Sequence, residues 1–220
     1  MATLPPNTMF LTGTIKFPKL AKPESAAQGQ PPKYSLTLSL NKNDPVAQAS
    51  INELNALIEK AAVEKFKENA PLVKHDQMAK HNFIIYKDGA TLLQEAQAKL
   101  AIAPNSEELK KKVKYAEYDK DSWVMTLSSA SRPGYYDMDT SIITDAQKIE
   151  ETFYAGATCR VMIVVSGFDH AASHNKGITA YLQGVQLIAR TAPLGGGMSA
   201  EEMQGFFTPV EPTPMEGAAV

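Results

Sequence analysis

Paired carboxylates are the side chains in this sequence whose spacing comes nearest to catalysis. Asp119 and Asp121 lie two residues apart, as do Asp137 and Asp139. Clustered carboxylates can hold divalent ions against a phosphate, as a metal-dependent nuclease requires. Each pair adjoins an expected strand end or turn, where Asp is common because it accepts hydrogen bonds from nearby backbone N–H groups. No third carboxylate with a lysine completes a nuclease-like set, so a nuclease is kept only as an alternative.

The histidines and the cysteine give weaker evidence of catalytic or metal-binding chemistry. His170 and His174 are four residues apart beside Asp169, a spacing that could share a metal on a helix, but the flanking residues are typical of a polar loop. Cys159 alternates with apolar neighbours and is expected in the core. Phosphate-loop, dinucleotide-binding, nucleophile-elbow, zinc-protease and Cys-x-x-Cys patterns are all missing from the sequence. We therefore predict a protein that is not an enzyme and needs no cofactor or metal.

Aromatic and basic residues that occur together at expected strand ends and turns point to a different chemistry. Non-specific binding of single-stranded nucleic acid needs a positively charged groove and flat side chains on which bases stack, each stacked base contributing about 1–3 kcal/mol. We expect phosphate contacts from Lys33, Arg132, Arg160 and Lys176. The expected stacking residues are Tyr135, Tyr136, Phe168, Tyr181 and, less clearly separated from the core, Tyr34 and Trp123.

The pattern leaves some of these roles open. Tyr34 and Trp123 share a face with apolar neighbours, so core and surface positions are equally compatible with the sequence. Arg160 and Phe168 share the less apolar face of their strand, which favours contact with a ligand. Tyr135 and Tyr136 follow a Pro-Gly turn, where burial of both rings is hard to arrange.

Five segments alternate between apolar and polar residues and predict the strands that position these side chains. They are residues 9–20, 33–40, 122–131, 158–168 and 178–190, the last kinked or bulged near Gly184. Between the second and third strands we predict a helix that begins at Asp44-Pro45 and ends before Pro71, an irregular stretch over 71–90, a helix over 92–101 and a further helix after the capping sequence 105–108. The fold class is therefore mainly β (α+β): a five-stranded OB-type antiparallel barrel within residues 1–191, with a helical insertion over about 44–120 and a flexible tail over 192–220.

Composition alone does not argue for nucleic-acid binding. The formal net charge of the 220 residues is −2. From Thr191 onward the chain carries four acids and no Lys or Arg, which leaves the preceding part weakly basic. The lysines at 110–114 are interpreted as a solvated helix face with no assigned role. A single cysteine and the lack of a recognisable signal peptide predict a cytoplasmic protein.

Four segments carry a resemblance to a known family: residues 33–45, 131–134, 153–160 and 176–186, the last two being the most specific. They resemble the phage-encoded single-stranded DNA-binding proteins of an OB-fold family formerly of unknown function, distantly similar to the replication proteins of short-tailed phages. The resemblance implies a barrel that coats single-stranded DNA during phage DNA replication and recombination in the infected bacterial cell.

The resemblance also bears on partners. Relatives often end in a strongly acidic tail with a terminal aromatic that recruits replication proteins. The tail of this chain has only four acidic residues, and the part best suited to a protein contact is the apolar pair Phe206-Phe207. The expected partners are thus single-stranded DNA and, through the tail, phage or host replication proteins. A homodimer is compatible with the sequence, and no membrane partner is expected.

Three rival functions are distinguishable by experiment. A strand-annealing recombination mediator would use the same groove and accelerate pairing of complementary strands. A metal-dependent nuclease would degrade an oligonucleotide with magnesium, and a virion structural protein would have no DNA affinity.

Overall fold

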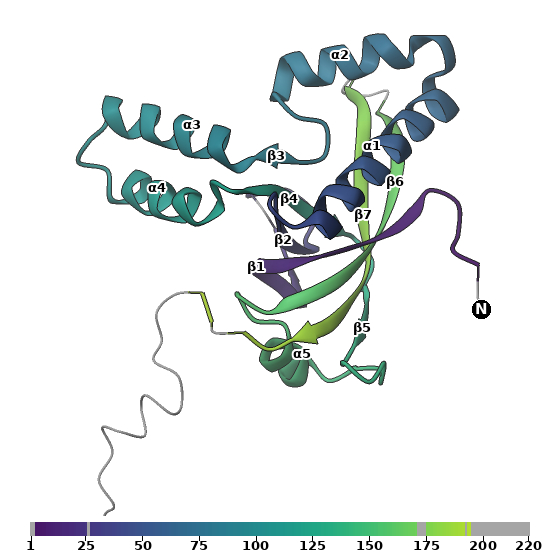
Figure 1. Cartoon of the computed structure of the whole chain (residues 1–220), viewed down its shortest axis with the longest axis vertical. Coiled ribbons are helices and arrows are strands. Elements are labelled where there is room, and N and C mark those ends of the chain that lie inside the picture. Colours follow the sequence, from purple (N-terminus) through teal and green to yellow (C-terminus); the bar gives the residue numbers. More distant parts are fainter. Residues whose placement is uncertain (1–2, 26, 171–174, 192, 195–220) are drawn as a thin grey trace, which may run out of the picture.

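Five long strands form the centre of the molecule (Figure 1). The computed structural model describes residues 3–25, 27–170, 175–191 and 193–194. The five strands are β1 (Thr8–Glu24), β2 (Lys33–Asn41), β4 (Ser122–Ser129), β6 (Thr158–His170) and β7 (Asn175–Ala189). They overlap all five strands predicted from alternation.

The strands close into a barrel. β1 pairs antiparallel with β2 and β6, β2 with β4, and β6 with β7. A parallel contact between Ser128 of β4 and Tyr181 of β7 closes the ring. The predicted five-stranded OB-type barrel is confirmed, but the closing contact makes it mixed instead of wholly antiparallel. Two short strands, β3 (Lys87–Asp88) and β5 (Gly134–Tyr136), extend it beside β4 and β7.

The barrel interior is filled by the apolar residues of the alternating pattern. Because successive strand residues point to opposite faces, every second side chain enters the core. Leu11, Leu36, Leu127, Val161 and Leu182 are among the fully buried ones.

The predicted core position of Cys159 is confirmed. Burial disfavours the thiolate and raises the pKa of this thiol to about 12.

Two helices between β2 and β4 pack against the barrel. The Asp44 side chain accepts a hydrogen bond from the Val46 N–H (2.9 Å) and caps α1 (Pro45–Phe66). A short 3₁₀ turn (Lys67–Asn69) joins α1 to α2 (Ala70–His81), so the prediction of an irregular stretch after Pro71 is wrong at its start. Pro71 lies in the first turn of α2, where a missing N–H breaks no helical hydrogen bond.

Two further helices form an arm that projects from the barrel (Figure 1). They are α3 (Gly89–Ile102) and α4 (Glu107–Asp119), which pack against each other. Both were predicted, and the Ser106 side chain caps α4 by accepting from the Leu109 N–H (3.3 Å). The arm leaves the barrel at β3 and returns at β4, so both of its ends are tied to one place.

One more helix and a β-bulge complete the described part of the barrel. α5 (Ala146–Thr152) precedes β6 and is capped by Asp145. A register shift between Met162 and Ile163 opposes three residues of β7 to two of β6, which confirms the bulge predicted near Gly184.

Within the described residues, no helix is both long and apolar enough to cross a membrane. The tail expectation for 192–220 lies almost entirely outside the described residues.

Candidate nucleic-acid interface

Strand register brings side chains from distant parts of the sequence into rows on the outer barrel face. In one row Tyr136 of β5 pairs with Gln186 of β7, and Gln186 pairs with Arg160 of β6. Arg160 in turn pairs with Thr12 of β1. Four strands therefore contribute to one row, and its members point away from the core because their neighbours in sequence point into it.

The next row lacks side chains at two adjacent positions. Gly134 of β5 pairs with Gly184 of β7, which pairs with Met162 of β6. A Cβ at Gly134 would lie 2.9 Å from the ring of Tyr136, and one at Gly184 would lie 3.7 Å from it. The ring therefore lies across the glycine backbone, and 38% of the residue stays exposed. A flat, supported and solvent-facing ring is the geometry on which a base can stack.

The side chain of Arg160, like the ring of Tyr136, is supported by a neighbouring part of the barrel face. Its guanidinium carbon lies 4.2 Å from the centroid of the Phe10 ring, and Arg160 itself is exposed. Stacking uses the flat face of the guanidinium, whereas its N–H groups lie in the plane and can still donate to phosphate oxygens. Phe10 was not among the predicted site residues, although its alternation with buried Met9 and Leu11 already placed it on the outer face.

Tyr181 extends this face toward β4. It pairs with Val164 of β6 and with Ser128 at the barrel closure, and it is 41% exposed. We call Phe10, Tyr136, Arg160 and Tyr181 the β-face cluster. Three of the four were predicted, and each member comes from a different strand.

Tyr135 belongs to the core. Only 1% of it is exposed, its hydroxyl donates to the Leu20 carbonyl (2.7 Å), and its ring centroid lies 5.7 Å from that of Phe153. Burial raises the pKa of Tyr135 well above its usual range. The prediction that Tyr135 stacks with a base is therefore wrong for this structure: adjacent strand residues face opposite sides, so of the two tyrosines only Tyr136 is exposed.

Arg132 and Tyr34 lie near the buried Tyr135, and Lys33 precedes Tyr34 on β2. The Arg132 guanidinium lies 5.7 Å from the Tyr135 ring centroid and donates to the Thr144 carbonyl. Lys33 is exposed and Tyr34 half-buried at the start of β2. Arg132 lies in the short link between β4 and β5, two residues before Gly134, which pairs with Gly184 of β7.

Three predicted residues lie elsewhere. Phe168 is half-buried, with its ring centroid 5.3 Å from that of His170, and Lys176 is exposed opposite Asp169; both lie at the far end of the β6–β7 hairpin. Trp123 is the second residue of β4 and is half-buried against the core. The structure does not bring these three together with the β-face cluster.

Three of the four paired carboxylates are engaged in structural contacts, and the fourth, Asp121, is exposed. Asp119 is buried and accepts hydrogen bonds from Lys16 and from the Ser39 hydroxyl (2.7 Å). Asp137 and Asp139 accept from backbone N–H groups within their own turn. Hydrogen bonds from Ser141 lower the pKa of Asp139. In the described part of the chain, no three His, Cys, Asp or Glu side chains are placed to hold a metal ion, and His174 lies outside that part.

A family model described as Enterobacter phage Enc34, ssDNA-binding protein matches residues 11–211 of this chain. The chain belongs to this family. The match includes every strand that contributes to the β-face cluster, although Phe10 lies one residue before it. No curated protein matches the chain at a significant level.

Solved structures of the Enc34 protein share the fold. The single-stranded DNA-binding protein from bacteriophage Enc34 in complex with ssDNA is 21% identical, with a TM-score of 0.60, and the match covers 86% of this chain and 90% of that one. The Enc34 protein in a second structure is 20% identical, with a TM-score of 0.59 over 87% of this chain and 86% of that one. At this identity the likeness establishes the shared fold of the two proteins.

Proposed function

We propose that this member of the Enc34 family binds single-stranded DNA without sequence specificity, by stacking and phosphate contacts on the outer barrel face. The observation that supports this most directly is the β-face cluster: exposed rings and a cation from four strands gather on one rigid surface. The family match and the shared fold with a protein whose structure is in complex with ssDNA point the same way.

In this mechanism the strands of the sheet hold the side chains in place, and the contacts of these side chains with DNA give the affinity. The rings of Tyr136 and Tyr181 stack with bases, and Arg160 and Arg132 neutralise phosphates. Because every base has a flat face, stacking tolerates any sequence, and the lack of base-edge readout makes the binding non-specific. Lys33 and Tyr34 extend the path past Arg132, and Phe168 and Lys176 contact DNA only if it reaches the end of the β6–β7 hairpin.

The proposed setting is replication and recombination of phage DNA in the cytoplasm of the infected cell. There the protein would protect exposed single strands, a task of binding and not of catalysis. The engagement of Asp119, Asp137 and Asp139 in hydrogen bonds of the fold supports binding over cleavage. Recruitment of replication proteins through the tail is part of this proposal.

The test is a titration of labelled oligo-dT and of duplex DNA of equal length, with and without magnesium. We expect oligo-dT to bind more tightly than the duplex, to survive intact in magnesium, and to bind less tightly as salt rises. Equal affinity for both DNAs, or none for oligo-dT, would sink the proposal.

A further inference from the structure

One face of α4 carries a stripe of side chains that the barrel core does not use. Lys111, Lys114, Tyr115 and Tyr118 recur at the spacing i, i+3, i+4 and i+7, which places them on one side of a helix. The tyrosines are 49% and 61% exposed. A stripe of rings at this spacing ordinarily packs into a core, so its exposure needs a different explanation.

The stripe faces a groove, not open solvent. A cavity of about 680 Å³ separates α4 from the barrel, and its wall includes all four stripe residues together with Phe17 of β1. The ring of Phe17 meets that of Tyr115 edge to face, with their centroids 5.3 Å apart. Three exposed aromatic rings and three lysines, the buried Lys16 among them, therefore line one hollow together with Ala155, Pro193 and Leu194. We call it the arm groove.

Phe17 adopts an unusual backbone conformation at this position. Its φ is +47°, a left-handed value that costs a non-glycine residue energy, and the register between β1 and β2 shifts here. The residue is nevertheless 51% exposed, so burial of the ring does not offset that cost. Strain retained without burial is typical of functional sites.

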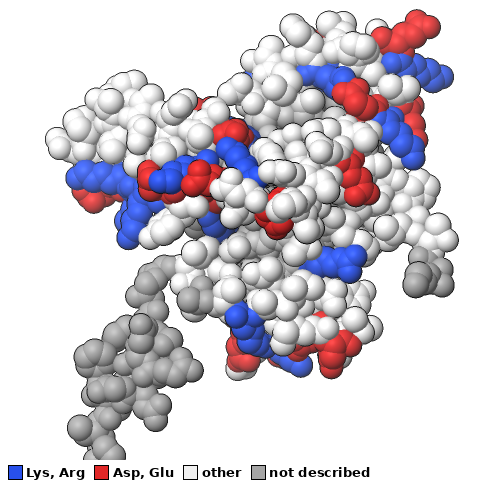
Figure 2. Space-filling view, in the orientation of Figure 1, with Lys and Arg blue, Asp and Glu red and all other residues white. Residues whose placement is uncertain are grey.

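Only some of the lysines on α4 have acidic partners. Lys110 pairs with Glu107 (2.7 Å) and Lys112 with Glu108 (2.6 Å), so these two charges, one on each flank of the stripe, are neutralised. Among the described residues, Lys111 and Lys114 form no ion pair. Figure 2 shows blue and red side chains interleaved along the arm, while the central barrel is mostly uncharged. The unpaired positive charge therefore lies with the rings that line the groove.

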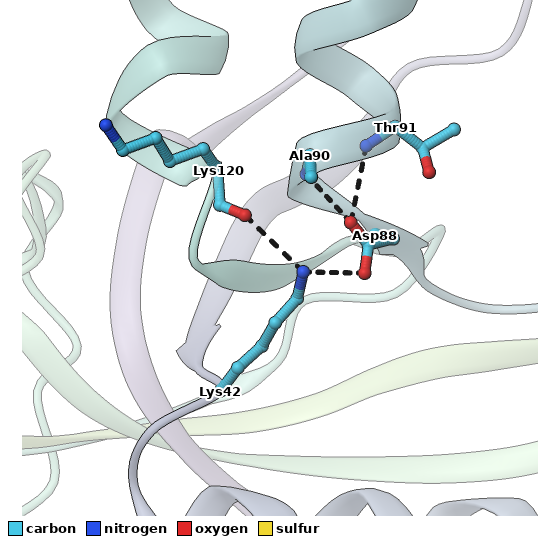
Figure 3. A network of polar contacts seen from close by, with 5 residues as sticks. All are labelled: Lys42, Asp88, Ala90, Thr91 and Lys120. Carbon is cyan, nitrogen blue, oxygen red and sulfur yellow. Dashed lines mark hydrogen bonds and ion pairs between the residues drawn. The ribbon is translucent and has the colours of Figure 1, made fainter.

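Contacts at the base of the arm fix the groove. Lys42, the residue after β2, contacts Asp88 at the start of α3 (2.6 Å) and donates to the Lys120 carbonyl just after α4 (3.4 Å) (Figure 3). Asp88 also caps α3 by accepting from the N–H groups of Ala90 (2.8 Å) and Thr91 (3.3 Å) (Figure 3). Both ends of the arm are thus joined to one side chain, which holds α4 at a set distance from the barrel.

A second fastening joins the arm to the strand that lines the groove. Asp119 at the end of α4 is buried with Lys16 of β1 and Ser39 of β2. Lys16 adjoins Phe17 in sequence and pairs with Thr37 of β2, whose hydroxyl lies 3.5 Å from that of Thr126 on β4. From Lys16, which lines the groove, strand pairing leads through Thr37 and Thr126 along the polar outer face of β2 and β4 to Ser128, opposite Tyr181.

From these observations we infer that the arm groove is a second subsite for single-stranded DNA, continuous with the barrel surface. Bases stack on Tyr115, Tyr118 and Phe17, and the phosphates beside them contact Lys111 and Lys114. The inference rests on the proposed function. Charge complementarity favours this occupant, since the groove combines the two features that single-strand binding requires, unpaired cations and exposed rings.

The test compares two double variants of the full chain that carry the same charge change. Lys111→Gln with Lys114→Gln removes the groove cations, and Lys110→Gln with Lys112→Gln removes the ion-paired cations that flank the stripe. Each is titrated with oligo-dT of increasing length at several salt concentrations. The groove variant should lose about 1.4 from the slope of log affinity against log salt, at about 0.7 per phosphate, and the control should lose far less. The difference should appear only with oligonucleotides long enough to leave the barrel face.

A second pair of variants tests stacking. Tyr115→Ala with Tyr118→Ala should weaken binding of the long oligonucleotides roughly five- to 150-fold for each base lost, whereas the two Tyr→Phe changes should retain it. Oligonucleotides carrying iodouracil should crosslink to Tyr115 or Tyr118. Circular dichroism confirms that each variant is folded.

The outcomes separate this inference from the proposed function. If the wild-type protein binds oligo-dT but the groove and control variants behave alike at every length, with no crosslink in the groove, the subsite is refuted and the barrel site stands. That result is also expected if the groove serves a protein partner. If the wild-type protein does not bind oligo-dT, both proposals fail.

Discussion

The β-face cluster and the arm groove use the same kinds of side chain, flat rings and cations, but assemble them in different ways. The cluster takes one residue from each of four strands, and its members are fixed by backbone pairing. The groove takes four of its five ligand-facing residues from one helix, and its geometry depends on contacts at the base of the arm. The difference suggests that the barrel surface is rigid, whereas the arm surface depends on a few contacts that mutation can remove.

The largest expected effect comes from removing the buried contact between Asp119 and Lys16, which joins the arm to β1. Asp119→Ala leaves the buried Lys16 without its carboxylate, and we expect the free energy of unfolding to fall by about 3–5 kcal/mol. Urea denaturation measures this loss. Asp121→Ala, an exposed neighbour, should change stability by no more than about 0.5 kcal/mol. Equal effects in the two variants would show that the contact does not hold the arm.

The next effect concerns the barrel alone. Tyr136→Ala should weaken oligo-dT binding by about 1–3 kcal/mol, because one stacking platform is lost. Tyr136→Phe keeps the ring and should bind nearly as well as the wild type. A fluorescence titration with an oligonucleotide too short to reach the arm isolates the barrel contribution. Loss of binding in both variants would mean that the hydroxyl, and not the ring, makes the contact.

A smaller effect distinguishes the cation on the barrel from those on the arm. Arg160→Gln should lower the salt slope by about 0.7 at every oligonucleotide length, whereas the arm lysines act only at long lengths. Arg160→Lys should retain the slope but bind less tightly, since an ammonium cannot stack flat on Phe10. A dependence on length in Arg160→Gln would contradict the division into two subsites.

The smallest effect is a pH dependence at the base of the arm. The Lys42 contact lowers the pKa of Asp88 below its ordinary value of 3.8. A lowered pKa in the folded state stabilises the fold above that value, and the stabilisation is lost as pH falls through the lower, folded-state pKa. The pair is partly exposed, so we expect less than about 1 kcal/mol. Melting temperatures of wild type and Asp88→Asn should differ at neutral pH and converge in acid; a constant difference would contradict this linkage.

The sequence predicted the strands well because each barrel strand buries one face, and burial imposes a period of two. It failed at Pro71, because a proline that ends one helix can equally begin the next. The sequence also did not show which of Tyr135 and Tyr136 is buried and which is exposed. The two are adjacent on a strand too short to show alternation, and only the pairing of β5 with β7 decides which ring enters the core.

For the functional surface, the sequence by itself determined which side chains were available and where along the strands they lay. Only the tertiary structure decided which of them meet. Phe10 and Arg160 lie far apart in the chain, and the pairing of β1 with β6 stacks one on the other. The sequence was interpreted as placing the lysines at 110–114 on a solvated helix face, because local sequence does not say what a helix face meets in the folded chain. That was settled by the contacts of Lys16 and Lys42, distant residues whose charges hold the arm beside the barrel.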